Sequence, residues 1–177
     1  MHSKILLLSL LLICVQGAGF AQTKDRNYAK SSVYIELGGA AGLWSVNYDR
    51  SIWEINERFN LHGRAGVGIL SEFNGAGFPD VLIPISSTVL WGGSSHRLEG
   101  GGGFTYFNWT LRDVSTTTGF VRKTEILGHL TLGYRYQKIE GGFMFRVTYS
   151  PIIYNYSNAP YEHWAGVSVG YTFKTKG

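Results

Sequence analysis

This chain of 177 residues lacks several features that stabilise or anchor other small proteins. It has one cysteine, Cys14, and therefore cannot build a disulfide framework. Beyond the first apolar stretch, no apolar run reaches the roughly 20 residues that a transmembrane helix needs. Charged residues make up 16% of the chain, whereas globular domains carry about 25%. These absences exclude a disulfide-rich scaffold and a helical membrane protein.

Concentrated binding or catalytic motifs are also missing. The formal net charge is +4, but no basic cluster exceeds two residues, which argues against a nucleic-acid partner. No two histidines have metal-ligand spacing, and none lies in a nucleophile motif. The glycine-rich stretches 63–68 and 100–103 precede no helix, so they lack the anion-binding geometry of a phosphate loop. The sequence therefore predicts no catalytic, metal-binding or cofactor-binding residues and no cofactor.

The N-terminus has the organisation of a secretory signal peptide. Lys4 supplies a basic start, Ile5–Val15 an apolar core, and Gly19 and Ala21 the small residues that precede cleavage. We therefore predict a signal peptide over residues 1–21, cleaved after Ala21, followed by a short polar leader over residues 22–32. Export also argues against nucleic acid as a partner.

A lipoprotein signal is the alternative at this end of the chain. Cys14 would then be the acylated residue. Leu12 and Ile13, directly before it, are bulkier than that processing site usually takes. The signal peptide is the better interpretation.

What the chain does contain is glycine, aromatic residues and strict alternation. It has 24 glycines, and 15% of its residues are aromatic. Between residues 126 and 136 every second residue is apolar, small or aromatic, which places these side chains on one face of a strand. An exported chain of this composition without disulfides is typical of an all-β protein. The alternation predicts eight strands, at residues 33–38, 44–49, 59–70, 81–91, 97–107, 125–137, 143–150 and 164–173.

The connections between these strands alternate in length. Short turns are expected at 53–58, 92–95 and 138–141, and longer connections at 71–79, 108–122 and 152–163. Short turns on one side and long loops on the other are typical of a transmembrane β-barrel. The first hairpin, at residues 40–42, is the exception because it is short. We predict an eight-stranded antiparallel up-and-down transmembrane β-barrel over residues 33–177.

The lysines indicate which face of the strands points outward. They lie in the signal, the leader, strand ends, one turn and the tail, whereas a soluble barrel would carry lysines along its wet strand faces. The apolar face is therefore predicted to meet lipid. Eight strands leave an interior just wide enough for side chains to fill it, so acids and arginines should pair in a closed lumen. The predicted structural network comprises Glu36, Asp49, Arg64, Glu99, Glu125, His129, Arg135 and Arg146.

Aromatic residues gather near the predicted strand ends, where rings at the water–lipid boundary form girdles. A family resemblance is carried by the signal peptide and by residues 47–50 (Asn-Tyr-Asp-Arg), 98–104, 133–137, 143–146 and 166–173. Through these segments the chain resembles the small outer-membrane β-barrel proteins of Gram-negative bacteria, the OmpA-like superfamily. The resemblance implies an outer-membrane location, contact with outer-membrane lipid, insertion by the barrel-assembly machinery and a monomer. Members usually finish on an aromatic residue, whereas this chain continues past Phe173. We expect no peptidoglycan-binding domain, so that part of the OmpA role is not carried over.

The expected function is a structural or surface-interaction role through the outer loops, without catalysis. The polar loop at 108–122 and the tyrosine-rich loop at 154–164 suit adaptable contacts with an unidentified extracellular partner. One alternative is an outer-membrane enzyme acting on lipid A or peptides. His129 with Thr131, or His163 and Glu162 beside Ser157, would then supply the chemistry. The other alternative is a soluble periplasmic lipocalin-like carrier, whose apolar face would point inward.

Overall fold

The computed structural model describes residues 29–56, 58–70, 79–112, 119–154 and 160–174. The predicted signal peptide and residues 22–28 of the predicted leader lie outside these ranges. Eight long strands dominate the fold: β1 (Ser31–Gly38), β2 (Trp44–Glu54), β3 (Phe59–Leu70), β4 (Asp80–Trp91), β5 (His96–Arg112), β6 (Phe120–Gln137), β7 (Gly142–Tyr149) and β10 (Ala165–Phe173). A 3₁₀ turn, η1 (Gly39–Ala41), and the two-residue strands β8 (Ile152–Ile153) and β9 (Tyr161–Glu162) complete it.

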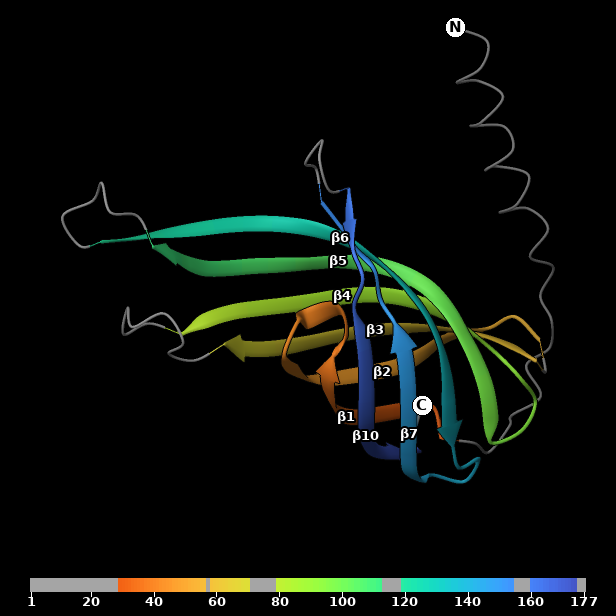
Figure 1. Cartoon of the computed structure of the whole chain (residues 1–177). Coiled ribbons are helices and arrows are strands. Elements are labelled where there is room, and N and C mark those ends of the chain that lie inside the picture. The colour runs from red at the N-terminus through yellow and green to blue at the C-terminus, as the bar shows by residue number, and fades with distance from the viewer. Residues whose placement is uncertain (1–28, 57, 71–78, 113–118, 155–159, 175–177) are drawn as a thin grey trace, which may run out of the picture.

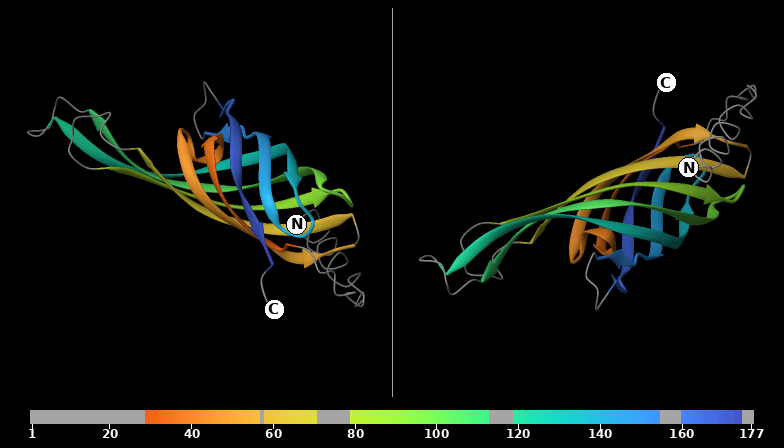
Figure 2. Two further views of the ribbon diagram at one scale, coloured as in Figure 1. Left: turned by 90° about the horizontal axis from the view of Figure 1, so that it is seen from below. Right: turned by 90° about the horizontal axis from the view of Figure 1, so that it is seen from above.

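The eight long strands close into one antiparallel up-and-down barrel (Figures 1 and 2). Each strand pairs with the next along the chain, β7 pairs with β10, and β10 returns to pair with β1. The short turns 55–58, 92–95 and 138–141 lie at one end, which we call the turn end. Residues 39–43 lie at the opposite, loop end, where β3, β5 and β7 also end. The predicted fold class is confirmed. No helix among the described residues is long and apolar enough to cross a membrane.

Several predicted boundaries differ from the structure. β2 runs to Glu54, past its predicted end at residue 49 and into the predicted turn 53–58. Most of the predicted loop 108–122 is strand, because β5 runs to Arg112 and β6 begins at Phe120, with Thr110 opposite Arg122. The resulting hairpin continues well past the ends of β1 and β10 (Figure 1). β1 begins at Ser31, within the predicted leader, because Ser31 pairs with both Arg50 and Phe173.

Pro84 lies inside β4 without a bulge. The pairs Ala65–Ile85 and Gly68–Leu82, on either side of it, have the same register. The ladder to β3 is interrupted only between these pairs, consistent with a proline that has no N–H to donate. A proline is thus accommodated by a local loss of hydrogen bonds, and the alternation of faces continues through it.

The loop-end mouth of the barrel is filled from within. Gly38, Gly39 and Gly42 have positive φ angles, which glycine adopts without steric cost, and these turn η1 into the lumen. The Thr105 hydroxyl donates to the Ala40 carbonyl at 2.8 Å and anchors η1 against β5. Buried apolar side chains close around it; this apolar plug consists of Ala41, Leu82, Phe107, Leu127 and Ile152, with Tyr154 and Trp164 packed against it.

Candidate functional site

The centre of the lumen holds a chain of ion pairs that crosses the barrel. Arg135 donates from both terminal nitrogens to Asp49, at 3.0 and 3.1 Å, and from Nε to Glu99 Oε2 at 3.1 Å. Arg146 donates from Nε to Glu99 Oε1 and from Nη1 to Glu36 Oε1, both at 2.6 Å. The order Asp49–Arg135–Glu99–Arg146–Glu36 thus alternates in sign across five strands, and all five side chains are buried. We call these five residues the ion chain.

Other polar side chains continue the ion chain at both ends. At one end, Asp49 Oδ1 lies 2.7 Å from His62 Nδ1. The same oxygen accepts a hydrogen bond from the Ser32 hydroxyl at 3.2 Å. At Glu36, Arg64 Nη1 is 3.8 Å from Oε2, while Arg64 Nε donates to Ser86 at 2.9 Å. The Tyr34 ring lies under Arg146, 5.6 Å from its guanidinium carbon, which adds a cation–π contact.

The local sequence explains how these charges fit. Arg135 and Arg146 face each other directly on β6 and β7, an arrangement that like charges would destabilise. Glu99 accepts from both and separates them. Glycines make the room: a Cβ on Gly133 would lie 3.2 Å from Glu99 Cγ, and one on Gly39 would lie 2.6 Å from Glu36 Cδ. Buried acids and arginines are tolerated because each has its partner.

The structure places two of the eight predicted network residues apart from the ion chain. Glu125 lies closer to the loop end than Leu127 does, beyond the apolar plug. It forms an ion pair with Lys123 at 2.5 Å. His129 contacts Thr105 at 3.2 Å. Glu36, Asp49, Arg64, Glu99, Arg135 and Arg146 come together. Tyr34 was not anticipated, although its position two residues before Glu36 puts it on the same face.

The outer wall has the opposite character. Large apolar side chains face away from the barrel, with Ile126 69% and Phe104 65% exposed, while the charged residues of the ion chain face inward. Aliphatic side chains form a belt around the middle of the wall; this apolar belt includes Val33, Ile35, Ile85, Leu130, Leu132, Val167 and Val169. A soluble barrel has the reverse arrangement.

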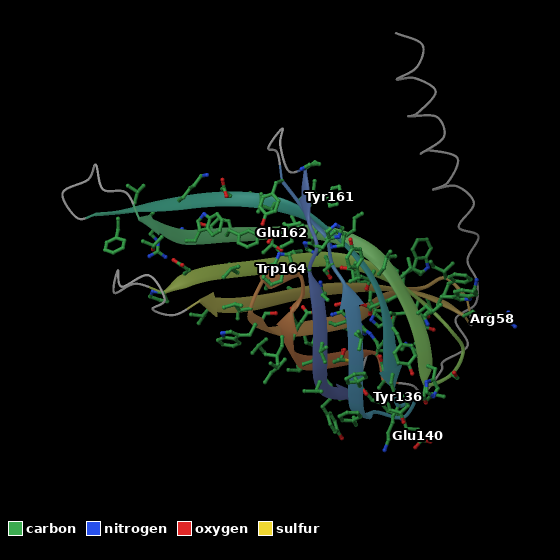
Figure 3. The ribbon with its side chains drawn as sticks, in the orientation of Figure 1. Arg58, Tyr136, Glu140, Tyr161, Glu162 and Trp164 are labelled. Atoms are coloured by element: carbon green, nitrogen blue, oxygen red, sulfur yellow. The ribbon has the colours of Figure 1, made fainter. Side chains whose placement is uncertain are left out.

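Aromatic residues border the apolar belt at both ends. At the turn end Phe59 stacks on Trp91 at 6.1 Å, and His96 hydrogen-bonds Tyr134 at 2.5 Å. At the loop end Tyr149 hydrogen-bonds His163. Tyr136 and Tyr161 lie at these opposite ends (Figure 3). Rings at two levels with an aliphatic band between them are the pattern of a barrel wall in a bilayer.

Beyond the loop-end aromatics the outer surface of the β5–β6 hairpin turns polar. Asn108 donates to the Thr124 hydroxyl at 3.1 Å and accepts from Arg122 Nε at 2.5 Å, and Arg122 Nη2 donates to the Pro79 carbonyl at 3.0 Å. These residues follow directly after Tyr106 and Ile126 on the same face. The apolar belt therefore ends at a defined level on this hairpin.

Comparison with one solved structure supports this fold. The N-terminal β-barrel domain of Pseudomonas aeruginosa OprF is similar with a TM-score of 0.56 and 19% identity, covering 82% of this chain and 99% of that one. The fold is that of an eight-stranded outer-membrane barrel. Two structures of the Yersinia pestis outer membrane protein Ail show TM-scores of 0.47 and 0.45 at 11% identity, covering 82% of this chain and 99% and 98% of theirs. No protein-family profile and no curated protein sequence matches the chain.

Residues considered for catalysis occupy two separate places in this barrel. His129 and Thr131 face the lumen and are at most 2% exposed. His163 is exposed at the loop end, where it bonds Tyr149, while Glu162 accepts from the Tyr154 hydroxyl at 2.8 Å. Ser157 lies outside the described residues. Within the described parts of the chain, no three His, Cys, Asp or Glu residues are grouped to hold a metal ion.

Proposed function

We propose that this chain is a monomeric integral protein of the bacterial outer membrane with a structural or surface-interaction role at its loop end. The observation that carries the proposal is the arrangement of faces, with an apolar belt outside and the ion chain inside. In water, an apolar surface of this extent would be an aggregation liability. In a bilayer the same side chains contact outer-membrane lipid, and the closed barrel leaves no unpaired strand edge in the hydrocarbon.

The surface role rests on the part of the barrel that extends past the apolar belt. The β5–β6 hairpin projects farther than its neighbours (Figure 1), and its outer face is polar above Tyr106. Tyr161, which is 55% exposed, adds an adaptable aromatic contact beside it. An extracellular partner would meet these residues first. Insertion by the barrel-assembly machinery follows from the same proposal.

Cell fractionation combined with gel mobility tests the membrane assignment. The protein should be found in the outer-membrane fraction and, unboiled, should run faster on an SDS gel than after boiling, because a closed barrel resists the detergent. Recovery from the soluble periplasm without a mobility change would overturn the proposal. Ile85→Asp and Leu130→Asp, which place a charge on the apolar belt, should reduce the folded fraction in membranes. Glu140→Gln at the turn end is the matched control and should not.

The two alternatives meet specific obstacles in this geometry. A lipocalin-like carrier needs an apolar, open lumen, whereas Arg135 and Arg146 occupy this one. An enzyme needs a histidine that substrate can reach, which directs attention to His163 rather than His129. A deletion strain complemented with wild type, His163→Ala or His129→Ala should show unchanged lipid A and peptide turnover. Turnover that depends on His163 would establish the enzymatic alternative.

A further inference from the structure

The outer wall of the barrel carries an arginine on β2. Tyr48 and Arg50 are exposed, whereas Asp49 between them is buried in the lumen. Because side chains alternate along a strand, Arg50 lies on the face that carries the apolar belt. A charged side chain on a lipid-facing wall is unfavourable unless it finds a partner. The position of Arg50 therefore raises the question of what it binds.

The strand register places Arg50 on the belt side of the turn-end aromatic residues. The exposed Trp53 lies three residues closer to the turn end on the same strand, roughly 10 Å along it. Across the two ladders, Arg50 is opposite Ser31 on β1 and Gly63 on β3. Ile52 covers Gly63, where a Cβ would lie 2.5 Å from Ile52 Cδ1. Arg50 thus extends from the wall close to the level at which lipid tails give way to headgroups.

No side chain within the described ranges compensates the charge of Arg50, which forms no hydrogen bond or ion pair there. By contrast, Arg122 on the outer face of the β5–β6 hairpin donates to two oxygens of the chain. Lys30, next to Ser31, forms an ion pair with Glu54 at 3.0 Å, so these two charges cancel each other. One positive charge remains on this part of the wall, and its partner has to come from outside the described chain.

Two hydroxyl groups lie beside Arg50. Ser31 is opposite Arg50, and the Tyr48 hydroxyl is 3.1 Å from Ser31 Oγ. Tyr48 is two residues farther from the turn end than Arg50, so its side chain reaches back to the level of Arg50. A guanidinium group offers several N–H donors in a planar fork that matches phosphate oxygens. Serine and tyrosine hydroxyls are common additional contacts to phosphate.

The surrounding wall indicates which phosphate this site meets. Val33 and Ala65 flank Tyr48 on the neighbouring strands and continue the apolar surface away from the turn end. A glycerophospholipid has this same order, with a phosphate at the bilayer boundary and acyl chains on one side of it. We propose that Arg50 and the Tyr48 hydroxyl bind the phosphate of a glycerophospholipid in the leaflet at the turn end. This inference rests on the proposed membrane location and adds a specific ligand to it.

Lipid titration of the folded barrel tests the site. The barrel in dodecyl maltoside, a detergent without phosphate, is titrated with phosphatidylglycerol, and native mass spectrometry measures the lipid retained. Arg50→Gln should weaken binding at least about tenfold, because it removes a charge-assisted hydrogen bond. Arg50→Lys should have an intermediate effect, since it keeps the charge but loses the planar fork. Equal binding by wild type and Arg50→Gln overturns the proposal.

A matched control and the contribution of the hydroxyl are measured in the same titration. Arg58→Gln removes the same charge from the turn that precedes β3 (Figure 3) and should bind phosphatidylglycerol as wild type does. An equal loss in Arg58→Gln and Arg50→Gln would show general attraction to positive charge and overturn a defined site. Tyr48→Phe should weaken binding less than Arg50→Gln, because it removes a neutral donor.

Solid-state NMR of the wild type in phosphatidylglycerol bilayers measures the contact directly. The lipid phosphorus should dephase the signal of the Arg50 guanidinium carbon, whereas Arg135 and Arg146 in the lumen serve as internal references without contact. Absence of dephasing at Arg50 in the inserted barrel overturns this inference alone, even if a variant fails to fold. Failure of the wild type to insert into bilayers would overturn the proposed function and this inference with it.

Discussion

The two regions that fill the lumen differ in how they are stabilised. The apolar plug at the loop end depends on non-directional contacts, which tolerate exchange of similar side chains. The ion chain depends on hydrogen bonds with specific geometry, and removing one member leaves its neighbours charged, buried and unpaired. The difference means that the plug should respond to lost volume, whereas the ion chain should respond to lost charge.

The largest effect is expected from neutralising the centre of the ion chain. Glu99→Gln keeps the size of the side chain but leaves Arg135 and Arg146, directly opposite each other, without the carboxylate between them. We expect a loss of about 3–5 kcal/mol in the free energy of unfolding, as for other broken buried pairs. Urea titration of the barrel in lipid vesicles measures it. A loss below about 1 kcal/mol would show that the ion chain contributes little.

The apolar plug should show the opposite dependence on size and chemistry. Leu127→Ala removes buried volume beside Phe107 and Ile152 and should cost about 2–4 kcal/mol in unfolding free energy. Leu127→Met keeps the volume and should cost less than about 1.5 kcal/mol. The same urea titration applies. Equal losses for the two substitutions would contradict a plug stabilised by packing.

The contact between plug and ion chain is tested at η1. Gly39 and Gly42 both have φ near +75°, so alanine strains the backbone at either position. Only at Gly39 would the new Cβ lie 2.6 Å from Glu36; at Gly42 no atom lies within 4 Å. Gly42→Ala should cost about 1–3 kcal/mol, as expected for a residue held in a sparsely populated backbone region, and Gly39→Ala should cost more. Thermal unfolding of the two variants side by side measures the difference, which should vanish in a Glu36→Ala background.

The smallest effect is expected from an ion pair outside the lumen. Lys30 Nζ lies 3.0 Å from Glu54 Oε1, with side chains 36% and 18% exposed. Glu54→Gln is the same chemical change as Glu99→Gln but should cost less than about 1 kcal/mol, because water screens exposed charges. Urea midpoints of the two variants compare them directly. A loss at Glu54 as large as that at Glu99 would mean that burial does not control the strength of these pairs.

The strands and their faces were predictable because alternation is a local property. Val33, Ile35 and Leu37 alternate with Tyr34 and Glu36, and no knowledge of partner strands is needed to separate the two faces. The boundaries of the β5–β6 hairpin were less accessible, since Thr110 and Arg122 are paired by a register that composition does not reveal. The bonds of the ion chain were not predictable either. Asp49 and Arg135 are 86 residues apart and meet only because the barrel closes.

The sequence by itself determined the period-two alternation, the eight strands and the placement of charge on one face, because these follow from the geometry of an extended chain. Only the tertiary structure decided which carboxylate meets which arginine, why His129 and Glu125 are separated from that set, and how η1 enters the mouth. These depend on the stagger between strands and on closure of β10 against β1, which bring distant residues to the same level of the lumen.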